Sequence, residues 1–497
     1  MMTVRKGAFI AAMAAAVVYA PALRNGFTLD DTPIVEENPR AHDIGLALRA
    51  FDEPWWPPPH DAGQWRPLTI LSFAADWQLS GGSTVWLHAV NVLWHAAATG
   101  LLVLVLAPFA GAGGALAGAL VFAVHSVHVE AVANLVGRAE LMAAVFLLLA
   151  LLCARAARAA AAAGRRTWPA ELGMLACVAL GLLSKEHAAV AVALLVLDDW
   201  ALGGARPGER LPRRAIVATL ALTLAWFLAR RSVEGGRSFV AVAPTFFGLD
   251  VTGRVSTMLP TVFDVVRLLV WPFALSPDYH PEVVPRLTHP TALGLAGALL
   301  LASLVALAIL LWRRNRGASA ALWITGIAYL PTSNLLFPSG IVLAERALYL
   351  PSVGVALLAA LCVERLRTKG RLALGVLALA LVALTVRTVT RIPVWRSSRA
   401  LVVDGVLTRP ESYKVRQAAA RVLMKTGRGR EALREYALAA ELYDHDPYLL
   451  TEAGSAALAL REPRLALRFL ERSHQLDSNY TLTRQLLGRA RVEASLR

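Results

Sequence analysis

The longest uncharged stretch of the chain limits its possible folds more than any other feature. From Trp77 to Val129 there are 53 residues without Asp, Glu, Lys or Arg. One helix crosses the apolar core of a bilayer with about 20 residues, so this stretch is too long for a single span. A cluster of turn-forming residues interrupts it, namely Pro108, Gly111, Gly113 and Gly114. The sequence therefore predicts a helical hairpin with spans near 85–107 and 112–127.

The composition extends this interpretation to most of the chain. Hydrophobic residues make up 57% and charged residues only 17%, which excludes an ordinary soluble enzyme and a disordered chain. The three cysteines all lie in apolar runs, which argues against a disulfide framework. The formal net charge of +15 could indicate nucleic acid as a partner, but in a membrane chain it first reports topology, and we expect no nucleic acid.

We expect an all-α polytopic membrane protein with about eleven transmembrane helices. The first run, 7–23, resembles a signal peptide, but it is longer than a usual h-region, so we interpret it as an uncleaved span. The hairpin contributes two more spans. The others lie near 139–154, 169–184, 187–200, 214–230, 290–312, 318–337, 346–363 and 371–391.

The distribution of cations predicts a cytoplasmic N-terminus. Short loops on that side carry clusters, whereas the opposite short loops carry the single cations Arg138, Lys185 and Arg346. The segment from Val255 to Leu275 is apolar enough to span, but counting it would invert every later loop, so we interpret it as interfacial or re-entrant. The clusters are Arg155, Arg158, Arg165 and Arg166; Arg206, Arg210, Arg213 and Arg214; Arg313, Arg314 and Arg316; and Arg365, Arg367, Lys369 and Arg371.

Two domains follow from this topology. Residues 1–395 form the membrane domain, with large external segments at 24–83 and 231–289. Residues 396–497 have a soluble, amphipathic composition and would also be external. They contain a repeat of period 34 that relates Ala420, Gly454 and Gly488, and also Ala432 and Ala466, in the register of tetratricopeptide repeats. Generic helical hairpins are the alternative. Such an array could bind an extended acceptor or a partner protein, or could simply cap the membrane domain.

Ionisable residues at the external membrane face are the candidate site, because charge near hydrocarbon is costly and usually functional. In the first external segment, Asp30 and Asp31 are adjacent acids, of which one can act as a base or ligand; solvated acids at a helix start are the alternative. Arg66, in the string "WRPL", offers a planar fork for a phosphate.

The segment between the third and fourth spans carries the second group. His125, His128 and Glu130 could ligate a metal, hydrogen-bond a sugar or orient a carboxylate. Arg138 is a further candidate phosphate contact. Lys185 and Glu186 lie between two apolar runs, where an internal ion pair is equally reasonable.

The last group lies between the ninth and tenth spans, in "SNLLFPSGIVLAERALYLPSVG". Asn334, Glu345 and Arg346 are its candidate residues. Taken together, the external face offers three Arg, one Lys and several carboxylates. A lipid-phosphate substrate would need this mixture of charges.

Six motifs in order resemble the transmembrane and tetratricopeptide-repeat O-mannosyltransferase family over nearly the whole chain. They are "NGFTLDD", "WRPL", "HSVHVEAVANLVGRAEL", "LLSKE", "SNLLFPSGIVLAERALYLPS" and the repeat array. More distantly the chain is similar to protein O-mannosyltransferases and other enzymes of the glycosyltransferase C fold. One departure is the array, which is shorter than those of the eukaryotic relatives.

The resemblance implies transfer of a hexose, with mannose expected, from a polyprenyl-phosphate donor in the membrane to Ser or Thr of a translocated protein. In that scheme Asp31 acts as base with Asp30 as its partner, although the sequence cannot separate them, and transfer inverts the anomeric carbon. Cations stabilise the departing phosphate. We expect no resident cofactor and no metal, with a divalent ion as the alternative. The Ala-, Arg- and Leu-rich composition favours a bacterial inner membrane, with the repeats in the periplasm.

Two other functions remain open at this point. The same fold could glycosylate a lipid or an envelope glycan. A non-catalytic membrane anchor that displays the repeats as a scaffold would explain the C-terminal part, but it has no need for charged motifs on the external face.

Overall fold

The computed structural model describes residues 3–58, 63–203, 210–235, 242–280, 283–366 and 371–496. Within these ranges the chain forms helices and connecting segments and no strand, so the predicted all-α fold is confirmed. Three of the predicted cytoplasmic cations, Arg206, Arg367 and Lys369, lie outside the described residues, as do parts of the second external segment.

Six helical segments in the described part are long and apolar enough to cross a membrane, which confirms a multi-pass membrane protein. Their helices are α1 (Val4–Tyr19), α4 (Thr84–Ala123), α6 (Arg138–Ala162), α9 (Arg213–Val233), α12 (Ala292–Arg314) and α15 (Arg371–Arg391). Four shorter helices match further predicted spans. They are α7 (Trp168–Ser184), α8 (Ala191–Leu202), α13 (Arg316–Tyr329) and α14 (Ser352–Leu366). The number of eleven spans stays a prediction.

The predicted hairpin is present within α4. Its backbone breaks at Gly111, whose φ of 63° lies in the left-handed region that glycine adopts without strain. The reversal brings His95 Nε2 to 3.2 Å from the carbonyl oxygen of Ala123. The returning arm packs closely on α14, since a Cβ at Gly118 would lie 2.3 Å from the Ala356 carbonyl oxygen.

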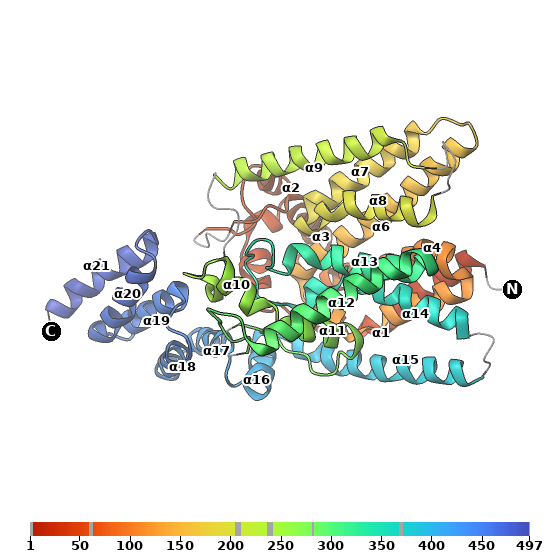
Figure 1. Ribbon diagram of the computed structural model, residues 1–497. Helices are drawn as coiled ribbons and strands as arrows, with labels where there is room; N and C mark the ends of the chain where they lie inside the picture. Colours follow the sequence, from red (N-terminus) through yellow and green to blue (C-terminus); the bar gives the residue numbers. More distant parts are fainter. Residues whose placement is uncertain are drawn as a thin grey trace.

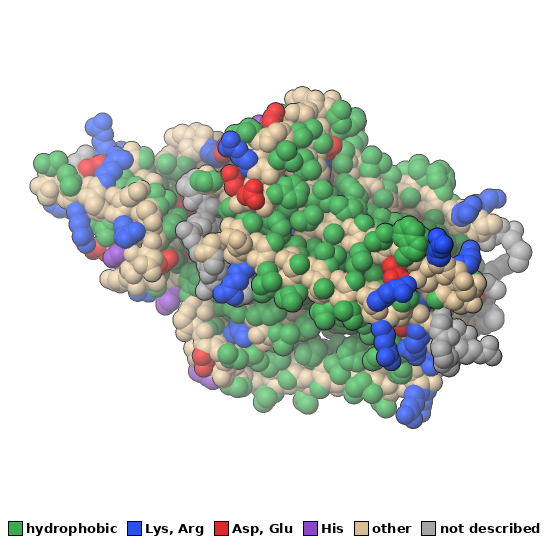
Figure 2. All heavy atoms as spheres, turned by 90° about the horizontal axis from the view of Figure 1, so that it is seen from above, with side chains coloured by type: hydrophobic (Ala, Val, Ile, Leu, Met, Phe, Trp, Pro, Cys, Tyr) green, Lys and Arg blue, Asp and Glu red, His purple; other side chains and the backbone are tan. Residues whose placement is uncertain are grey.

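The helices run side by side in one bundle, with the N-terminus at one end and the C-terminal helices beyond the other (Figure 1). Hydrophobic side chains cover the middle of the surface, while Lys and Arg gather at the end that carries the N-terminus and on the C-terminal helices (Figure 2). This distribution is expected for a bundle whose middle lies in hydrocarbon. The predicted orientation stays a prediction.

The segment 255–275 is divided between two short helices, α10 (Val251–Met258) and α11 (Thr261–Val270). Neither has the roughly 20 residues that a span requires. The link between them packs on α12, because a Cβ at Gly297 would lie 2.1 Å from the Leu259 carbonyl oxygen. This geometry supports the interfacial or re-entrant interpretation.

Short elements form the end of the bundle that lies next to the C-terminal helices. The first external segment folds around a small apolar core that includes Ile34, Trp55 and Phe73. Its elements are η1 (Ala20–Arg24), η2 (Thr32–Glu36), η3 (Pro39–Ala41), α2 (Ile44–Ala47), η4 (Leu48–Phe51) and α3 (Pro67–Ser80). The other elements are η5 (Ser126–His128), α5 (Val129–Ala133), η6 (Leu135–Gly137), η7 (Glu186–Val190), η8 (Pro244–Phe246), η9 (Leu330–Thr332), η10 (Glu345–Leu348) and η12 (Ile392–Arg396).

The C-terminal helices pair as the 34-residue period predicts, α17 with α18 and α19 with α20. Small residues allow the close approach: a Cβ at Gly454 would lie 2.5 Å from Leu470 Cγ. The assignment to tetratricopeptide repeats and the boundary at 395/396 stay predictions. The helices are α16 (Ser398–Thr408), α17 (Tyr413–Lys425), α18 (Gly429–Leu442), α19 (Pro447–Ala459), α20 (Pro463–Leu476) and α21 (Thr481–Ser495).

Candidate active site

Asp31 is fully buried and saturated with backbone hydrogen bonds. Its Oδ2 accepts from the amides of Thr28 at 3.0 Å and Leu135 at 3.3 Å, and its Oδ1 accepts from the amide of Val136 at 2.9 Å. Burial raises the pKa of Asp31 to about 7, while these three amide bonds oppose the rise. The carboxylate thus ties the first external segment to the segment between α4 and α6.

Asp30 has a different environment although it is the next residue. Its side chain is half-buried, and its carboxylate accepts no hydrogen bond from any other residue that the structure describes. Leu29, immediately before it, has a φ of 45°. A non-glycine residue there is strained by about 1 kcal/mol or more, and such strain is maintained where a side chain must point in a set direction. This placement favours reversing the two roles expected from the sequence.

Arg346 is the most accessible of the candidate phosphate contacts, with 24% of its side chain exposed. Its backbone amide and its Nη1 both donate to the carboxylate of Glu130, at 2.9 and 2.5 Å. The Nε and Nη2 groups have no partner among the described residues. The guanidinium is thus oriented by Glu130 and still has donors available for an anion.

Two further ion pairs involve Lys185 and Glu186, which lie between α7 and α8. Lys185 lies 2.5 Å from Glu140, which also accepts from His187 Nδ1 at 2.8 Å. Arg66 forms a fork with Glu186, at 3.1 and 3.2 Å. Each candidate cation is therefore fixed by a carboxylate from another element.

The charges of these groups act on one another's pKa values. Burial lowers the pKa of Arg346, but Glu130, Asp30 and Glu140 together raise it above its usual range. Burial lowers the pKa of Lys185 to about 8, and Glu140 opposes the shift, while Arg66 and Arg346 reinforce it. Asp30, Lys185, Arg66 and Arg346 come from four distant parts of the sequence, and the fold brings them together.

Arg138 does not lie where the sequence suggested. Its side chain is completely buried and donates to Asp76 Oδ2 at 2.5 Å, to Asn91 Oδ1 at 2.8 Å and to the Leu87 carbonyl oxygen at 2.9 Å. With its donors satisfied inside the bundle, it cannot reach a phosphate without breaking this network. Its role in this structure is to join α3, α4 and α6.

The two histidines are also buried and bonded to protein groups. His125 Nε2 lies 3.0 Å from the Leu269 carbonyl oxygen, and His128 Nε2 lies 2.7 Å from Ser352 Oγ. Burial lowers the pKa of His128 well below its usual range, so it is neutral at pH 7. Within the described ranges, no three His, Cys, Asp or Glu residues are grouped so as to hold a metal ion.

Asn334 and Glu345 organise the segment that precedes α14. Asn334 has a φ of 56°, and its amide nitrogen donates to the carbonyl oxygens of Ile341 and Val342. Glu345 is buried and accepts from the Ser276 amide at 2.6 Å and from the Tyr279 hydroxyl at 3.0 Å. Burial raises its pKa to about 7. Both residues shape the loop that presents Arg346.

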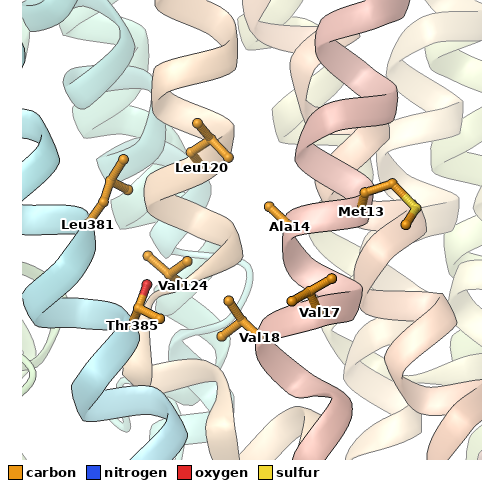
Figure 3. A pocket seen from close by; sticks show the side chains of 8 residues that line it. All are labelled: Met13, Ala14, Val17, Val18, Leu120, Val124, Leu381 and Thr385. Atoms are coloured by element: carbon orange, nitrogen blue, oxygen red, sulfur yellow. The ribbon is translucent and has the colours of Figure 1, made fainter.

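An apolar groove of about 410 Å³ lies between α1, α4 and α15 (Figure 3). Val18 and Val124 point into it from facing helices, and Thr385 is its single hydroxyl-bearing lining residue. Val124 directly precedes the segment 125–130, which ends at Glu130, the partner of Arg346. The other lining residues are Met13, Ala14, Val17, Leu120 and Leu381.

Glu140 and Trp55 belong to this site, but the sequence did not single them out; His187, which also belongs to it, directly follows the candidate residues Lys185 and Glu186. Glu140 pairs with Lys185, and the Trp55 ring lies 5.2 Å from the Arg66 guanidinium carbon. Glu140 is the next-to-last residue of the motif "HSVHVEAVANLVGRAEL", so the motif was recognised but the role of Glu140 was not. No local pattern could have indicated Trp55.

These features define a multi-pass membrane protein with an ionic site at one end of its bundle, beside a helical repeat array. No family model matches the chain, and no solved structure matches it. Curated proteins do match. Protein O-mannosyl-transferase F38B6.6 of Caenorhabditis elegans is 27% identical over 433 residues, which cover 84% of this chain and 60% of that protein.

Two further relatives are also named protein O-mannosyl-transferases. Protein O-mannosyl-transferase TMTC1 of Homo sapiens is 27% identical over 92% of this chain and 57% of its own length. Protein O-mannosyl-transferase Tmtc2 of Drosophila melanogaster is 32% identical over 55% of this chain and 30% of its own length. The chain is homologous to the transmembrane and tetratricopeptide-repeat O-mannosyltransferases, which confirms the resemblance. It spans 60% or less of the length of these three relatives.

Proposed function

We propose that the chain is a membrane glycosyltransferase that moves a hexose from a polyprenyl-phosphate donor to a Ser or Thr hydroxyl of a protein. The names of its relatives favour mannose and a protein acceptor. The single observation that carries the proposal is the placement of the open acid Asp30 near Arg346: its neighbour Asp31 is bonded to the amides of Leu135 and Val136, and Glu130, five residues before Leu135, holds the Arg346 guanidinium. A phosphosugar bound at a membrane surface requires an acid and several cations in this arrangement.

Asp30 is the proposed base. The hydroxyl oxygen of the acceptor forms a bond to the anomeric carbon on the face opposite the phosphate, the bond from that carbon to the phosphate oxygen breaks, and the hydroxyl proton passes to Asp30. The product is inverted at the anomeric carbon. A free Asp has a pKa of about 3.9, far below that of an alcohol, so the proton moves late, as the new bond forms. Asp31 positions the base by fixing the backbone around it.

The departing polyprenyl phosphate gains negative charge, which the three cations stabilise. Arg346 is the principal contact, since its Nε and Nη2 donors are available and Glu130 holds the guanidinium in place. Lys185 and Arg66 add positive charge around it. Loss of one preorganised contact of this kind commonly costs about 10² to 10³ in rate.

The apolar groove between α1, α4 and α15 is the proposed place for part of the polyprenyl tail. Its lining is almost entirely aliphatic, and it lies next to the segment that reaches Glu130. We also propose that the site faces the outside of a bacterial inner membrane, with the N-terminus in the cytoplasm and no metal required. The C-terminal repeats would lie on the same side and bind the acceptor.

Reconstitution tests the proposal. The purified chain in vesicles is mixed with polyprenyl-phosphate mannose and a Ser/Thr peptide, and mass spectrometry follows the peptide. We expect hexose on the peptide with the wild type and almost none with Asp30→Asn. Asp52→Asn is the matched control, because Asp52 is an exposed acid of the same segment. Equal transfer by wild type and Asp30→Asn would rule out the assignment, and transfer only to lipid would favour the lipid-acceptor alternative.

A further inference from the structure

The repeat array is bonded directly to the segment that carries Asp30. The Gly26 amide donates to the Arg396 carbonyl oxygen at 2.9 Å, the Thr28 hydroxyl donates to the Trp395 carbonyl oxygen at 2.9 Å, and the Leu29 amide donates to Ser398 Oγ at 2.9 Å. Residues 395–398 lead into the C-terminal helices. These three bonds therefore fix the first residues of the array relative to the segment that carries Asp30.

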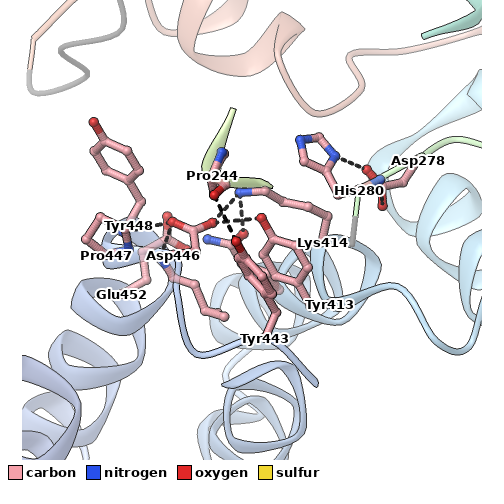
Figure 4. Close-up of polar contacts among 12 residues, drawn as sticks. Pro244, Asp278, His280, Tyr413, Lys414, Tyr443, Asp446, Pro447, Tyr448 and Glu452 are labelled. Carbon is pink, nitrogen blue, oxygen red and sulfur yellow. Dashed lines mark hydrogen bonds and ion pairs between the residues drawn. The ribbon is translucent and has the colours of Figure 1, made fainter. Parts of the chain in front are cut away.

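The second external segment holds the array from another side. Ser412 Oγ donates to Asp278 Oδ2 at 2.6 Å, and the Tyr443 hydroxyl donates to the Pro244 carbonyl oxygen at 2.8 Å. Figure 4 shows Asp278 with His280 beside the cluster of Tyr413, Lys414, Tyr443 and Asp446. Ser412 directly precedes α17, and Tyr443 directly follows α18 with its ring 4.9 Å from that of Tyr413, so the two contacts hold the start of α17 and the end of α18 in place. Helix α17 cannot swing away from the membrane domain without breaking them.

The far end of α17 lies against the first external segment. Lys425 Nζ is 3.6 Å from Glu37 Oε1, so this helix and the segment 30–37 face each other. Arg421 lies on the same face, one turn earlier. Burial lowers the pKa of Arg421, but Glu452 chiefly, with smaller effects from Tyr436 and Asp30, raises it above its usual range.

All charged residues of α17 are cations. Its sequence, YKVRQAAARVLMK, contains four cations and no acid, whereas the facing segment contains Asp30, Glu36 and Glu37. Lys414 and Arg416 are paired with Asp446 and Glu435 inside the array, so Arg421 and Lys425 are the cations of α17 that a polypeptide between the two elements would meet, with the acids of residues 30–37 on its other side. An acidic side chain of such a polypeptide would be attracted to these two cations.

The two cations of this face can take a further carboxylate in different ways. Lys425 and Glu37 are 67% and 64% exposed, and an exposed pair of this kind contributes about 0–1 kcal/mol, so a carboxylate of a bound peptide can replace Glu37 at little cost. Arg421 is held by Glu452 through two hydrogen bonds of 2.8 and 2.6 Å from its Nε and Nη2, while its Nη1 donates to no residue that the structure describes and can bond a peptide carboxylate without leaving Glu452.

We propose that the acceptor is an extended polypeptide with an acidic residue near its target Ser or Thr, and that it binds between α17 and residues 30–37. This inference rests on the proposed function and specifies the acceptor of the same site. Arg421 and Lys425 contact the acidic residue, while the hydroxyl reaches Asp30. They are specificity-determining residues that take no part in the bond changes.

Peptide preference tests the proposal in reconstituted vesicles containing the full chain. Two Ser/Thr peptides differ only in carrying Asp or Lys beside the target. We expect the wild type to have a lower KM for the Asp peptide, and Arg421→Glu with Lys425→Glu to shift this preference by about 5- to 20-fold, as two exposed pairs imply. Arg489→Glu is the matched control, because Arg489 is exposed and lies two repeat periods after Arg421.

Two results separate the possible failures. If the wild type transfers hexose to both peptides with equal KM and the double variant is unchanged, the inference is overturned while the proposed function stands. If the wild type transfers no hexose to either peptide, the proposed function itself fails.

Photocrosslinking gives an independent readout that does not require turnover. A photoreactive phenylalanine analogue replaces Arg421, or Arg489 as the control, in the Asp30→Asn variant, and the Asp peptide is the probe. Capture of the peptide at 421 and not at 489 supports the proposal. Capture of lipid alone at 421, or equal capture at both positions, overturns it.

Discussion

The adjacent acids Asp30 and Asp31 give the most discriminating prediction. Changing Asp31 to Asn should mainly lower stability, whereas changing Asp30 to Asn should mainly lower the rate of transfer. Asp31 is fully buried and accepts three backbone hydrogen bonds. Asn offers one acceptor oxygen and an NH₂ donor. In the best orientation its oxygen keeps the amides of Thr28 and Leu135, and its nitrogen faces the amide of Val136.

That orientation leaves two buried donors without partners, the Val136 amide and the new NH₂ group. Each unsatisfied buried donor costs about 1–3 kcal/mol, so we expect Asp31→Asn to lower the free energy of unfolding by about 2–4 kcal/mol. Asp30→Asn breaks no hydrogen bond in the described part of the chain and should change stability by less than about 0.5 kcal/mol. In catalysis the order reverses, because loss of a general base costs about 10² to 10⁴ in rate.

Thermal unfolding followed by tryptophan fluorescence measures the first effect, and hexose transfer per folded molecule measures the second. We expect Asp30→Asn to be inactive with an unchanged Tm. Asp31→Asn should have a Tm lower by several degrees, since 1 kcal/mol shifts Tm by about 2–4 °C in domains of 150–250 residues and by less in longer chains. An inactive Asp31→Asn with wild-type Tm, beside an active Asp30→Asn, would refute the reasoning and restore Asp31 as the base.

The remaining predictions concern the cations and the groove. Arg138→Ala should lower stability by about 3–5 kcal/mol because it leaves the buried carboxylate of Asp76 unpaired, whereas Arg346→Ala leaves Glu130 its bond from the backbone amide of residue 346 and should chiefly lower kcat, by about 10² to 10³; the reverse pattern would return Arg138 to the phosphate site. Because burial lowers the pKa of Lys185 to about 8, its positive charge is lost as pH rises through this value, so the donor KM should increase between about pH 7 and 9. Lys185→Arg should keep that KM constant over the same range; a rise identical to that of the wild type would assign the titration to another group. Ala14→Trp should fill the groove and raise the KM for a long-chain donor more than for a short-chain donor; equal effects would argue against a tail in this place.

The sequence predicted the architecture where local composition determines it. Apolar runs have to be helices in a membrane because their backbone groups must be bonded internally, and the cluster from Pro108 to Gly114 marked the reversal within α4. The period of 34 likewise predicted the helical pairs, because small residues such as Gly454 recur where the helices touch.

The roles inside the site could not be predicted in the same way. Asp30 and Asp31 differ only in which of them meets the amides of Leu135 and Val136, and those amides belong to another part of the chain. Arg138 and Arg346 are both single cations beside a span. Only the folded structure shows that Asp76 and Asn91 enclose Arg138, whereas Glu130 holds Arg346 at an accessible surface.

A structure of the Asp30→Asn variant with a bound polyprenyl-phosphate hexose would show whether the donor binds between Asp30 and Arg346. We expect the donor phosphate on the guanidinium of Arg346, the anomeric carbon turned toward residue 30, and the lipid tail along α1, α4 and α15. A donor bound at the opposite end of the bundle, or with its phosphate remote from Arg346, would contradict this placement.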